Sequence, residues 1–400
     1  MSGNKIFKVA AFSAFPIHYL TPMLRLLSSH QELDLTVYWY SSYGIHEPYV
    51  DKEFGIKEVD WGIEHLYDLK YEFLTNVSPK PTRSFWGQIH PSVLGKLNRN
   101  RYDAVFMFGY DFFTDWIVFL VAWKKRIPIL FRGETNLKKK RSFLLQALKK
   151  FTVGPMLKRI DACLYSCEAT AEYYRNFGVS NKDLFFCPCA VDNDRFKSYA
   201  DELLPRRLEL RSQYGIPNDA VVFLFTGRLV SRKRPMDIIA AFEHLKSNYR
   251  SKAWMVFVGD GIEEKKLKDY SKRRNLKNVC FMGFRDQLEI SKFYSLADVF
   301  VLSSDFDPSP KSLNEAMNFS LPVIASDMVG TAPDLVCEGK NGFIYPTGNV
   351  EILSEYMGQM LSSPEMVKKM GKFSLLRVSK WNYEEDVNGV LHALRHVVHY

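Results

Sequence analysis

The sequence predicts an α/β protein built from two Rossmann-like domains, each with a parallel sheet. In the first half of the chain, short β-branched and aromatic runs alternate with longer amphipathic runs of helical period. The same alternation starts again after residue 200. Strands separated by helices in this way form a parallel sheet that is covered on both faces. Two such series therefore predict two sheets, in two domains that face a central cleft.

Each apolar run predicts one strand. The first half has such runs at 7–13, 35–41, 102–109 and 127–133, and the second at 221–227, 254–261, 279–284, 299–304 and 322–326. A polar stretch at 198–215, interrupted by Pro205, is typical of a linker with an entry helix. We therefore expect a first domain over 1–198, a second over 199–375, and a C-terminal helix within 376–400 that packs back on the first.

The composition agrees with two domains, since 400 residues with 46% hydrophobic content can form two cores. The six cysteines lack the spacing of zinc ligands, so we expect reduced thiols, a cytoplasmic protein and no metal. The start of the chain resembles a signal peptide, but Pro16 and His18 interrupt its apolar run. The longest apolar stretch, at 116–123, is far shorter than the ~20 residues that span a bilayer.

Ligands of open parallel sheets bind beyond the carboxyl ends of the strands, so the loops at those ends are the candidate site. Basic residues crowd the first such loop of the second half, which contains Gly227, Arg228, Arg232, Lys233 and Arg234. Arginine and lysine suit a diphosphate and can offset the negative charge that develops on a leaving group. The alternative is a solvated basic turn.

The loop after the strand at 299–304 brings carboxylates and a helix start to the same edge of that sheet. Ser309 is expected to cap this helix, with Pro310 at its first position. The backbone amides of Lys311 and Ser312 would then point outward, where they suit a phosphate. The next acidic residue on this helical face is Glu315, whose carboxylate can accept hydrogen bonds from a ribose diol. The alternative is an ordinary exposed helix residue.

Several segments of the second half have a characteristic order and spacing: FTGRLVSRKRP, VGDG, FMGF, DPSPKSLNEAMNFSLPVIAS, VGTAPDLV and KNGFIYPTGN. Together they resemble the retaining glycosyltransferases of family 4, a family of the glycosyl transferases group 1 with the GT-B fold. The segment that starts at Asp307 resembles the acidic-x7-Glu signature of that family. The resemblance implies a nucleotide-sugar-binding second domain and an acceptor-binding first domain.

The resemblance also implies a role for each candidate residue. Arg228 and Lys233 contact the donor diphosphate, Glu315 contacts the ribose, and Asp307 lies near the donor sugar. Asp307, Lys233 and Arg228 are thus the expected catalytic residues. The remaining donor-binding residues are Gly227, Lys311 and Ser312, with backbone near Phe284 and Arg285 at the base. No cofactor and no metal is implied, because cationic side chains supply the charge that a metal would provide.

Three positions depart from the pattern of the family. Asp307 stands where the family usually has glutamate, and Pro310 stands where it usually has glycine. The segment FRGETN replaces a histidine that many members offer to the sugar at the end of the fifth strand. The residues left for this contact on the acceptor or sugar side are Arg132, Glu134, Thr135 and His18. For His18 the alternative is an exposed loop histidine.

We therefore expect retaining transfer of a sugar, hexosyl by resemblance, from a nucleotide-diphosphate sugar to a glycan or lipid-linked acceptor. Such a step belongs to the biosynthesis of cell-surface polysaccharide or glycolipid. One alternative is a nucleotide-sugar-binding partner subunit that has lost catalysis, and another is a nucleotide-sugar epimerase on the same fold. Nucleic-acid binding is supported only by the net charge of +9, so we expect no nucleic-acid partner.

The stretch at 136–159 is rich in lysine and arginine, and no acidic residue occurs between Glu134 and Asp161. Its apolar residues recur at helical spacing, namely Phe143, Leu144, Ala147, Leu148 and Phe151. One interpretation is a surface helix whose apolar face packs on the first domain and whose basic back is solvated. The other is a helix that rests on an anionic membrane surface and makes the protein peripheral at the inner face of the membrane.

Overall fold

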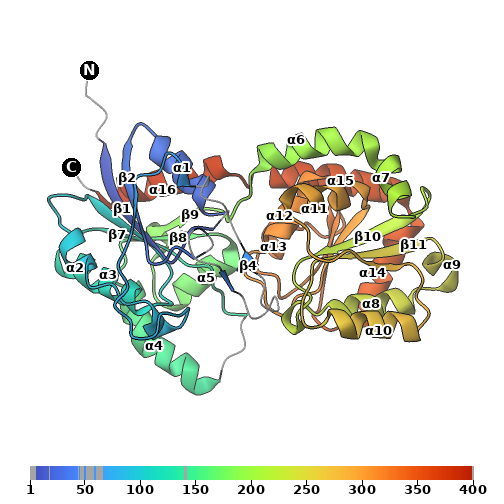
Figure 1. Ribbon diagram of the computed structural model, residues 1–400, viewed down its shortest axis with the longest axis horizontal. Coiled ribbons are helices and arrows are strands. Elements are labelled where there is room, and N and C mark those ends of the chain that lie inside the picture. Colours follow the sequence, from blue (N-terminus) through green and yellow to red (C-terminus); the bar gives the residue numbers. More distant parts are fainter. Residues whose placement is uncertain are drawn as a thin grey trace. The chain divides into compact units, whose positions relative to one another are not determined.

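The computed structural model describes residues 6–17, 19–43, 45, 49–50, 58–59, 66–138 and 142–398. His18 and residues 139–141 lie outside the described residues. The described chain divides into two compact units (Figure 1). The first contains the described residues up to 50, from 58 to 188 and from 383 on, and the second contains 189–382.

The first unit is a seven-stranded sheet in the order β5-β2-β1-β6-β7-β8-β9, with every neighbouring pair parallel. Its strands are β1 (Phe7–Ser13), β2 (Leu33–Trp39), β5 (Tyr71–Phe73), β6 (Ala104–Phe108), β7 (Ile129–Arg132), β8 (Ala162–Tyr165) and β9 (Leu184–Phe186). Its helices are α1 (Thr21–Ser29), α2 (Val93–Lys96), α3 (Phe113–Lys124), α4 (Phe143–Leu157), α5 (Glu168–Asn176) and α16 (Tyr383–Val397), with the short helices η3 (Phe85–Gly87) and η4 (Asn181–Asp183). The short strands β3 (Tyr49–Val50) and β4 (Glu58–Val59) form a separate antiparallel pair.

Alternate residues of each strand in this sheet enter two different cores. On one face, Phe12, Met107 and Phe131 pack with apolar residues of α3, α4 and α5. On the other face, Ala11 and Phe106 pack with apolar residues of α1 and α16. The two-residue period of the strands thus produces the double-sided burial that the sequence predicts.

The second unit is a six-stranded sheet in the order β12-β11-β10-β13-β14-β15, and its neighbouring pairs are also parallel. Its strands are β10 (Val221–Thr226), β11 (Ala253–Val258), β12 (Val279–Phe281), β13 (Val299–Leu302), β14 (Val323–Ser326) and β15 (Gly342–Tyr345). Its helices are α6 (Asn193–Leu203), α7 (Arg207–Gln213), α8 (Pro235–His244), α9 (Ser247–Arg250), α10 (Glu264–Arg273), α11 (Gln287–Leu296), α12 (Lys311–Asn318), α13 (Ala332–Leu335), α14 (Val350–Ser362) and α15 (Pro364–Val378), with the short helices η5 (Leu204–Arg206) and η6 (Ser231–Lys233).

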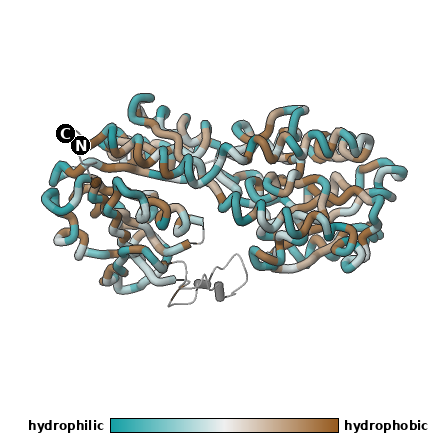
Figure 2. The backbone as a smooth tube through the Cα atoms, turned by 90° about the horizontal axis from the view of Figure 1, so that it is seen from above, coloured by the Kyte–Doolittle hydropathy of each residue, from teal (hydrophilic) through white to brown (hydrophobic). Residues whose placement is uncertain are grey.

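The helices of the second unit form two layers, one on each face of its sheet. Helices α8, α9, α10 and α14 pack together on one face, and α6, α7, α11, α12 and α15 on the other (Figure 1). Hydrophobic and hydrophilic residues alternate along the helical segments of the chain, as expected for helices with one buried face (Figure 2). Two Rossmann-like units with parallel sheets are thus present, as predicted.

The boundaries between the units differ from the expected ones. The change of unit falls at 188/189 instead of 198/199, because α6 packs on α11 and α12 of the second unit. The return falls at 382/383 instead of 375/376, because α15 lies wholly in the second unit. Asn193 secures this arrangement, since its side-chain amide donates to the carbonyl oxygens of Val378 and Trp381, at 3.1 Å each.

Helix α16 brings the end of the chain back to the first unit. It packs against α1, β8 and β9. At Gly389 the helix approaches β9 so closely that a Cβ would lie 2.0 Å from the carbonyl oxygen of Phe186. A larger residue there would push the helix off the sheet. No helix in the described part of the chain is long and apolar enough to cross a membrane.

Candidate active site

The loops at the carboxyl ends of β10, β11 and β12 are joined by backbone hydrogen bonds. The amide of Gly227 donates to Val258 O at 2.9 Å, and the amide of Gly259 donates to Gly283 O at 2.8 Å. A Cβ at Gly259 would lie 2.0 Å from Gly227 O, and the φ of Gly259 is +131°, so glycine is required there on both counts. Arg228 follows Gly227 directly and is partly exposed to solvent.

Two of the predicted catalytic residues meet in an ion pair. Lys233, at the end of η6, donates to a carboxylate oxygen of Asp307, which follows β13. The two side chains are 11% and 10% exposed. A nearly buried ammonium stays favourable only with an anionic partner, so Asp307 holds the Lys233 side chain in place at this edge of the sheet. A phosphate oxygen and this carboxylate oxygen are chemically similar acceptors for the same ammonium.

The turn around Lys233 is fixed from both sides. Arg234 adopts the left-handed conformation, with φ of 48°, and its guanidinium pairs with Asp237 of α8 at 2.6 Å. The hydroxyl of Ser303 donates to the carbonyl oxygens of Lys233 and Arg234, at 2.7 and 2.9 Å. The Lys233 side chain is therefore positioned by contacts to α8 and to the end of β13.

Helix α12 begins at Lys311, with Pro310 as its N-cap residue. The prediction of Ser309 as N-cap and Pro310 as the first helical residue is therefore wrong by one position. Pro310 has ψ of 120°, an extended value that cannot start the helix. Lys311 and Ser312 consequently occupy the first two helical positions, whose amides have no acceptor within the helix.

Glu315 is buried, with 4% exposure, so it is not an ordinary exposed helix residue. The hydroxyl of Tyr294 on α11 donates to Glu315 Oε2 at 2.7 Å and shares a hydrogen bond of 2.8 Å with the hydroxyl of Thr226 at the end of β10. This chain of side chains ties the carboxylate to the loop that starts at Gly227. Tyr294 was not predicted as a site residue, because an aromatic residue on an amphipathic helix is typical of a core position.

Phe284 and Arg285 follow β12 in the loop before α11. Phe284 is 54% exposed, and Arg285 pairs with Glu289 at 3.7 Å. Asp286 caps α11 by accepting a hydrogen bond of 2.8 Å from the amide of Glu289. The loop thus presents an exposed ring beside a capped helix, at the same edge of the sheet as Gly227. The described residues contain no group of three or more His, Cys, Asp or Glu side chains arranged to hold a metal ion.

On the first unit, the structure gives Arg132 a role other than the predicted sugar contact. Its guanidinium is buried, lies 3.1 Å from a carboxylate oxygen of Asp386 on α16 and donates to Pro188 O at 2.8 Å. Arg132 thus anchors the C-terminal helix. Glu134, two residues further on, is exposed beyond the end of β7, and Thr135 is partly exposed.

An aromatic loop near α3 was not predicted. Trp86 is 61% exposed, and its ring centroid lies 5.0 Å from that of Phe85 and 4.7 Å from that of Phe113 at the start of α3. Asn76 stiffens the loop, since its amide nitrogen donates to Gly87 O at 2.8 Å. Exposed aromatic rings on a rigid loop are typical of a ligand-contacting surface. In the sequence, the adjacent aromatic residues Phe85 and Trp86 inside a polar stretch could have indicated this loop.

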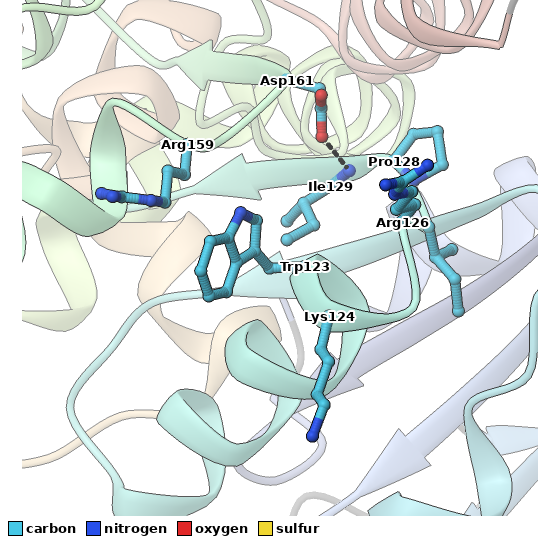
Figure 3. Close-up of a pocket in the computed structure, with 8 residues that line it drawn as sticks. Trp123, Lys124, Arg126, Pro128, Ile129, Arg159 and Asp161 are labelled. Atoms are coloured by element: carbon cyan, nitrogen blue, oxygen red, sulfur yellow. Dashed lines mark hydrogen bonds between the residues drawn. The ribbon is translucent and has the colours of Figure 1, made fainter.

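A pocket of about 470 Å³ lies at the opposite, amino end of β7 (Figure 3). It is lined by basic side chains and by Trp123, over whose ring the Arg159 guanidinium lies, 5.3 Å from the centroid. Asp161 in this pocket accepts a hydrogen bond of 2.8 Å from the Ile129 amide, and burial raises the pKa of its carboxyl. Ligands of parallel sheets bind at the other edge, so we assign this pocket no part in the site.

Comparison with known proteins agrees with this geometry. The family model of glycosyl transferases group 1 matches residues 206–376, which include β10 to β15 and all the predicted donor residues. Residues 206–376 belong to the glycosyl transferases group 1. The resemblance to the glycosyl transferases group 1 is therefore confirmed for the second unit.

Two relatives illustrate the similarity of this group 1 domain. Spore coat protein SA of Bacillus subtilis (strain 168) is 32% identical over 177 residues, which are 42% of this chain and 46% of that protein. The alpha-monoglucosyldiacylglycerol synthase of Acholeplasma laidlawii is 25% identical over 266 residues, 63% of this chain and 65% of that protein. The chain thus spans about half to two thirds of the length of these relatives.

Solved structures establish the fold over nearly the whole chain. Anabaena Alr3699/HepE in complex with UDP has a TM-score of 0.72 and 17% identity, covering 98% of this chain and 99% of its own. WaaG, a glycosyltransferase involved in lipopolysaccharide biosynthesis, has a TM-score of 0.64 and 14% identity, covering 96% and 98%. The predicted GT-B fold is confirmed.

Proposed function

We propose that this protein is a glycosyltransferase that moves a sugar, by resemblance a hexose, from a nucleotide-diphosphate sugar to an acceptor with retention of configuration. The observation that carries the proposal is the ion pair of Lys233 and Asp307, beside Arg228 and the start of α12. Cations, helix amides and a carboxylate gather at the edge of the sheet where a nucleotide is expected. The UDP bound to Alr3699/HepE supports a nucleotide donor.

Each donor group has a suitable partner in this arrangement. The diphosphate binds Lys233 and Arg228 and the amides of Lys311 and Ser312, and in doing so it displaces the carboxylate of Asp307 from the ammonium. The ribose hydroxyls donate to Glu315, which Tyr294 already orients. The base lies against the backbone near Phe284 and Arg285.

The released Asp307 then lies beside the donor sugar. The bond between the anomeric carbon and the diphosphate oxygen breaks, and the acceptor oxygen bonds to that carbon from the same face. The leaving phosphate takes the proton of the acceptor. Lys233 and Arg228 stabilise the charge that develops on the nucleoside diphosphate, so no metal ion is needed for this purpose.

We further propose that the acceptor is a glycan or lipid-linked molecule that docks on the first unit, in the biosynthesis of cell-surface polysaccharide or glycolipid at the cytoplasmic face of a membrane. Two similarities support this choice. One is to the alpha-monoglucosyldiacylglycerol synthase of Acholeplasma laidlawii, and the other is to WaaG, a glycosyltransferase involved in lipopolysaccharide biosynthesis. Glu134 and Thr135 beyond β7, and the aromatic loop around Trp86, are the candidate acceptor contacts. His18 stays a candidate from sequence alone.

The decisive experiment is a thermal-shift screen with UDP, GDP, TDP and their sugars in the presence of EDTA. A ligand of the folded state raises the apparent stability in proportion to ln(1 + [L]/Kd). We expect one nucleotide series to raise Tm, and the matching sugar donor to be hydrolysed or transferred with the anomeric configuration retained. No shift with any nucleotide would contradict the proposal. Binding without turnover would favour an inactive partner subunit, and an altered free donor would favour an epimerase.

A further inference from the structure

Helix α4 leaves most of its apolar side chains in solvent. Phe143 and Phe151 are 82% and 81% exposed, and Leu144 and Leu148 are 79% and 57% exposed. At about 100° per residue these four side chains fall within an arc of roughly 140° on the helix. The interpretation in which this face packs on the first domain is therefore wrong.

The buried contacts of α4 lie in its C-terminal half. Its buried residues all come from the C-terminal part of the helix: Val153, Gly154, Met156 and Leu157. Lys149, on the side of the helix away from the exposed arc, donates to Tyr110 Oη at 3.0 Å. In Figure 1 the N-terminal part of α4 extends away from the rest of its unit. The helix is thus anchored at one end and presents an apolar face at the other.

The charge around this face has one sign. Lys150, Lys158 and Arg159 are exposed, and Lys138 is partly exposed. In the sequence three further basic residues, 139–141, immediately precede the helix, and no acidic residue occurs from 135 to 160. Two copies of such a helix would repel each other, whereas an anionic lipid surface attracts it. Exposed apolar side chains flanked by lysine and arginine are the composition of helices that lie in the bilayer interface.

We infer that α4 inserts Phe143, Leu144, Leu148 and Phe151 among the lipids of an anionic bilayer, while the basic residues contact the headgroups. This inference rests on the proposed function only in that a lipid-linked acceptor lies at such a surface. Insertion differs from electrostatic adsorption in one measurable way, because burial of apolar side chains does not weaken as salt screens the charges. Binding to vesicles therefore has a salt-sensitive part and a salt-resistant part.

The test is flotation of the full chain with phosphatidylglycerol–phosphatidylcholine vesicles and with pure phosphatidylcholine vesicles, at low and high salt. The wild type should float with the anionic vesicles, and high salt should reduce this binding without abolishing it. Phe143→Asp/Phe151→Asp should lower binding by roughly a hundredfold, since each buried side chain contributes about tenfold or more. Changing Lys138, Lys139, Lys140 and Arg141 to serine should weaken the salt-sensitive part and leave the salt-resistant part unchanged.

Leu376→Asp is the matched control, because Leu376 is 61% exposed on α15 of the second unit and should not affect flotation. The nucleotide thermal shift of each variant reports on its folding and on its donor site. A variant that loses vesicle binding but keeps this thermal shift would support the membrane contact independently of the proposed function. Wild-type flotation of the double phenylalanine variant would overturn the inference. The inference would also be overturned if the wild type formed a concentration-dependent dimer that the double phenylalanine variant did not form, while both proteins floated equally. The apolar face of α4 would then be a dimer interface.

Discussion

Replacing Lys233 by alanine tests the role of the ion pair with Asp307. If the ammonium donates to the diphosphate, its loss removes a charge-assisted hydrogen bond of about 1.5 to 3 kcal/mol. This corresponds to an increase of about 10- to 150-fold in the Kd of the bare nucleotide, with a matching decrease in kcat/KM. The same change leaves Asp307 nearly buried without its partner. Breaking such a pair destabilises a protein by about 3 kcal/mol when the remaining charge is desolvated.

The double variant Lys233→Ala/Asp307→Asn separates these two effects. It removes the uncompensated charge, so its Tm should recover towards that of the wild type while its nucleotide affinity stays low. Asp307→Asn alone should bind the bare nucleotide as tightly as the wild type or up to about tenfold more tightly, because the diphosphate no longer competes with a carboxylate. Its turnover of the intact donor should fall. Calorimetry with the nucleotide and initial rates with the donor provide these numbers.

Two outcomes would refute this reasoning. One is an unchanged nucleotide Kd in Lys233→Ala with normal circular dichroism, which would mean that the ammonium does not contact the diphosphate. The other is a loss of nucleotide affinity in Asp307→Asn as large as that in Lys233→Ala. The carboxylate would then support binding instead of competing with it.

Four further predictions follow from the described contacts. Glu315→Ala should weaken binding of the bare nucleotide by about tenfold, and Tyr294→Phe should weaken it less, because Tyr294→Phe removes only one hydrogen bond to the Glu315 carboxylate. An unchanged nucleotide affinity of Glu315→Ala in calorimetry would exclude the ribose contact. Trp86→Ala should lower kcat/KM for the acceptor and leave nucleotide affinity unchanged, and equal acceptor kinetics would remove the aromatic loop from the site. Burial lowers the pKa of His90 from 6.5 to about 4, so the unfolded state binds a proton at a higher pH than the folded state does. The free energy of unfolding of the wild type should therefore fall by about 3 kcal/mol between pH 7 and pH 4 relative to that of His90→Phe, and an equal pH dependence of the two proteins in urea titrations would contradict this. EDTA should leave donor affinity and turnover unchanged, and activity that returns only with added magnesium would show that a metal supplies the charge.

The fold could be predicted because its signals are local. Nine of the thirteen strands in the two described sheets coincide with predicted apolar runs bounded by turn residues, and the helices between them follow from amphipathic spacing. The short strands β5, β8, β9 and β15 were not predicted. The boundary between the units was predicted ten residues too late, at 198/199 instead of 188/189. The sequence does not show that α6 packs on the core of the second unit. The start of α12 was predicted one residue too early, because proline is common at the first helical position, whereas Pro310 is the N-cap residue here.

The candidate site was partly predictable for the same reason. Lys233, Asp307 and Glu315 all follow or lie near strand ends, and parallel strands bring those ends to one edge. Their pairing was not predictable, since no sequence pattern states that Lys233 and Asp307 neutralise each other or that Tyr294 holds Glu315. Arg132 was misassigned because its partner Asp386 comes from a distant helix.

The return of α16 to the first unit has a consequence for how the chain is synthesised and how it can be divided. The part of the first unit that leaves the ribosome first remains incomplete until Tyr383–Val397 has emerged, because Arg132 is buried against Asp386 and β9 is covered at Gly389. A fragment that stops at Pro188 would expose that face and leave a buried guanidinium without its carboxylate. A working fragment of this unit would have to be spliced, with Tyr383–Val397 attached through a linker after Pro188.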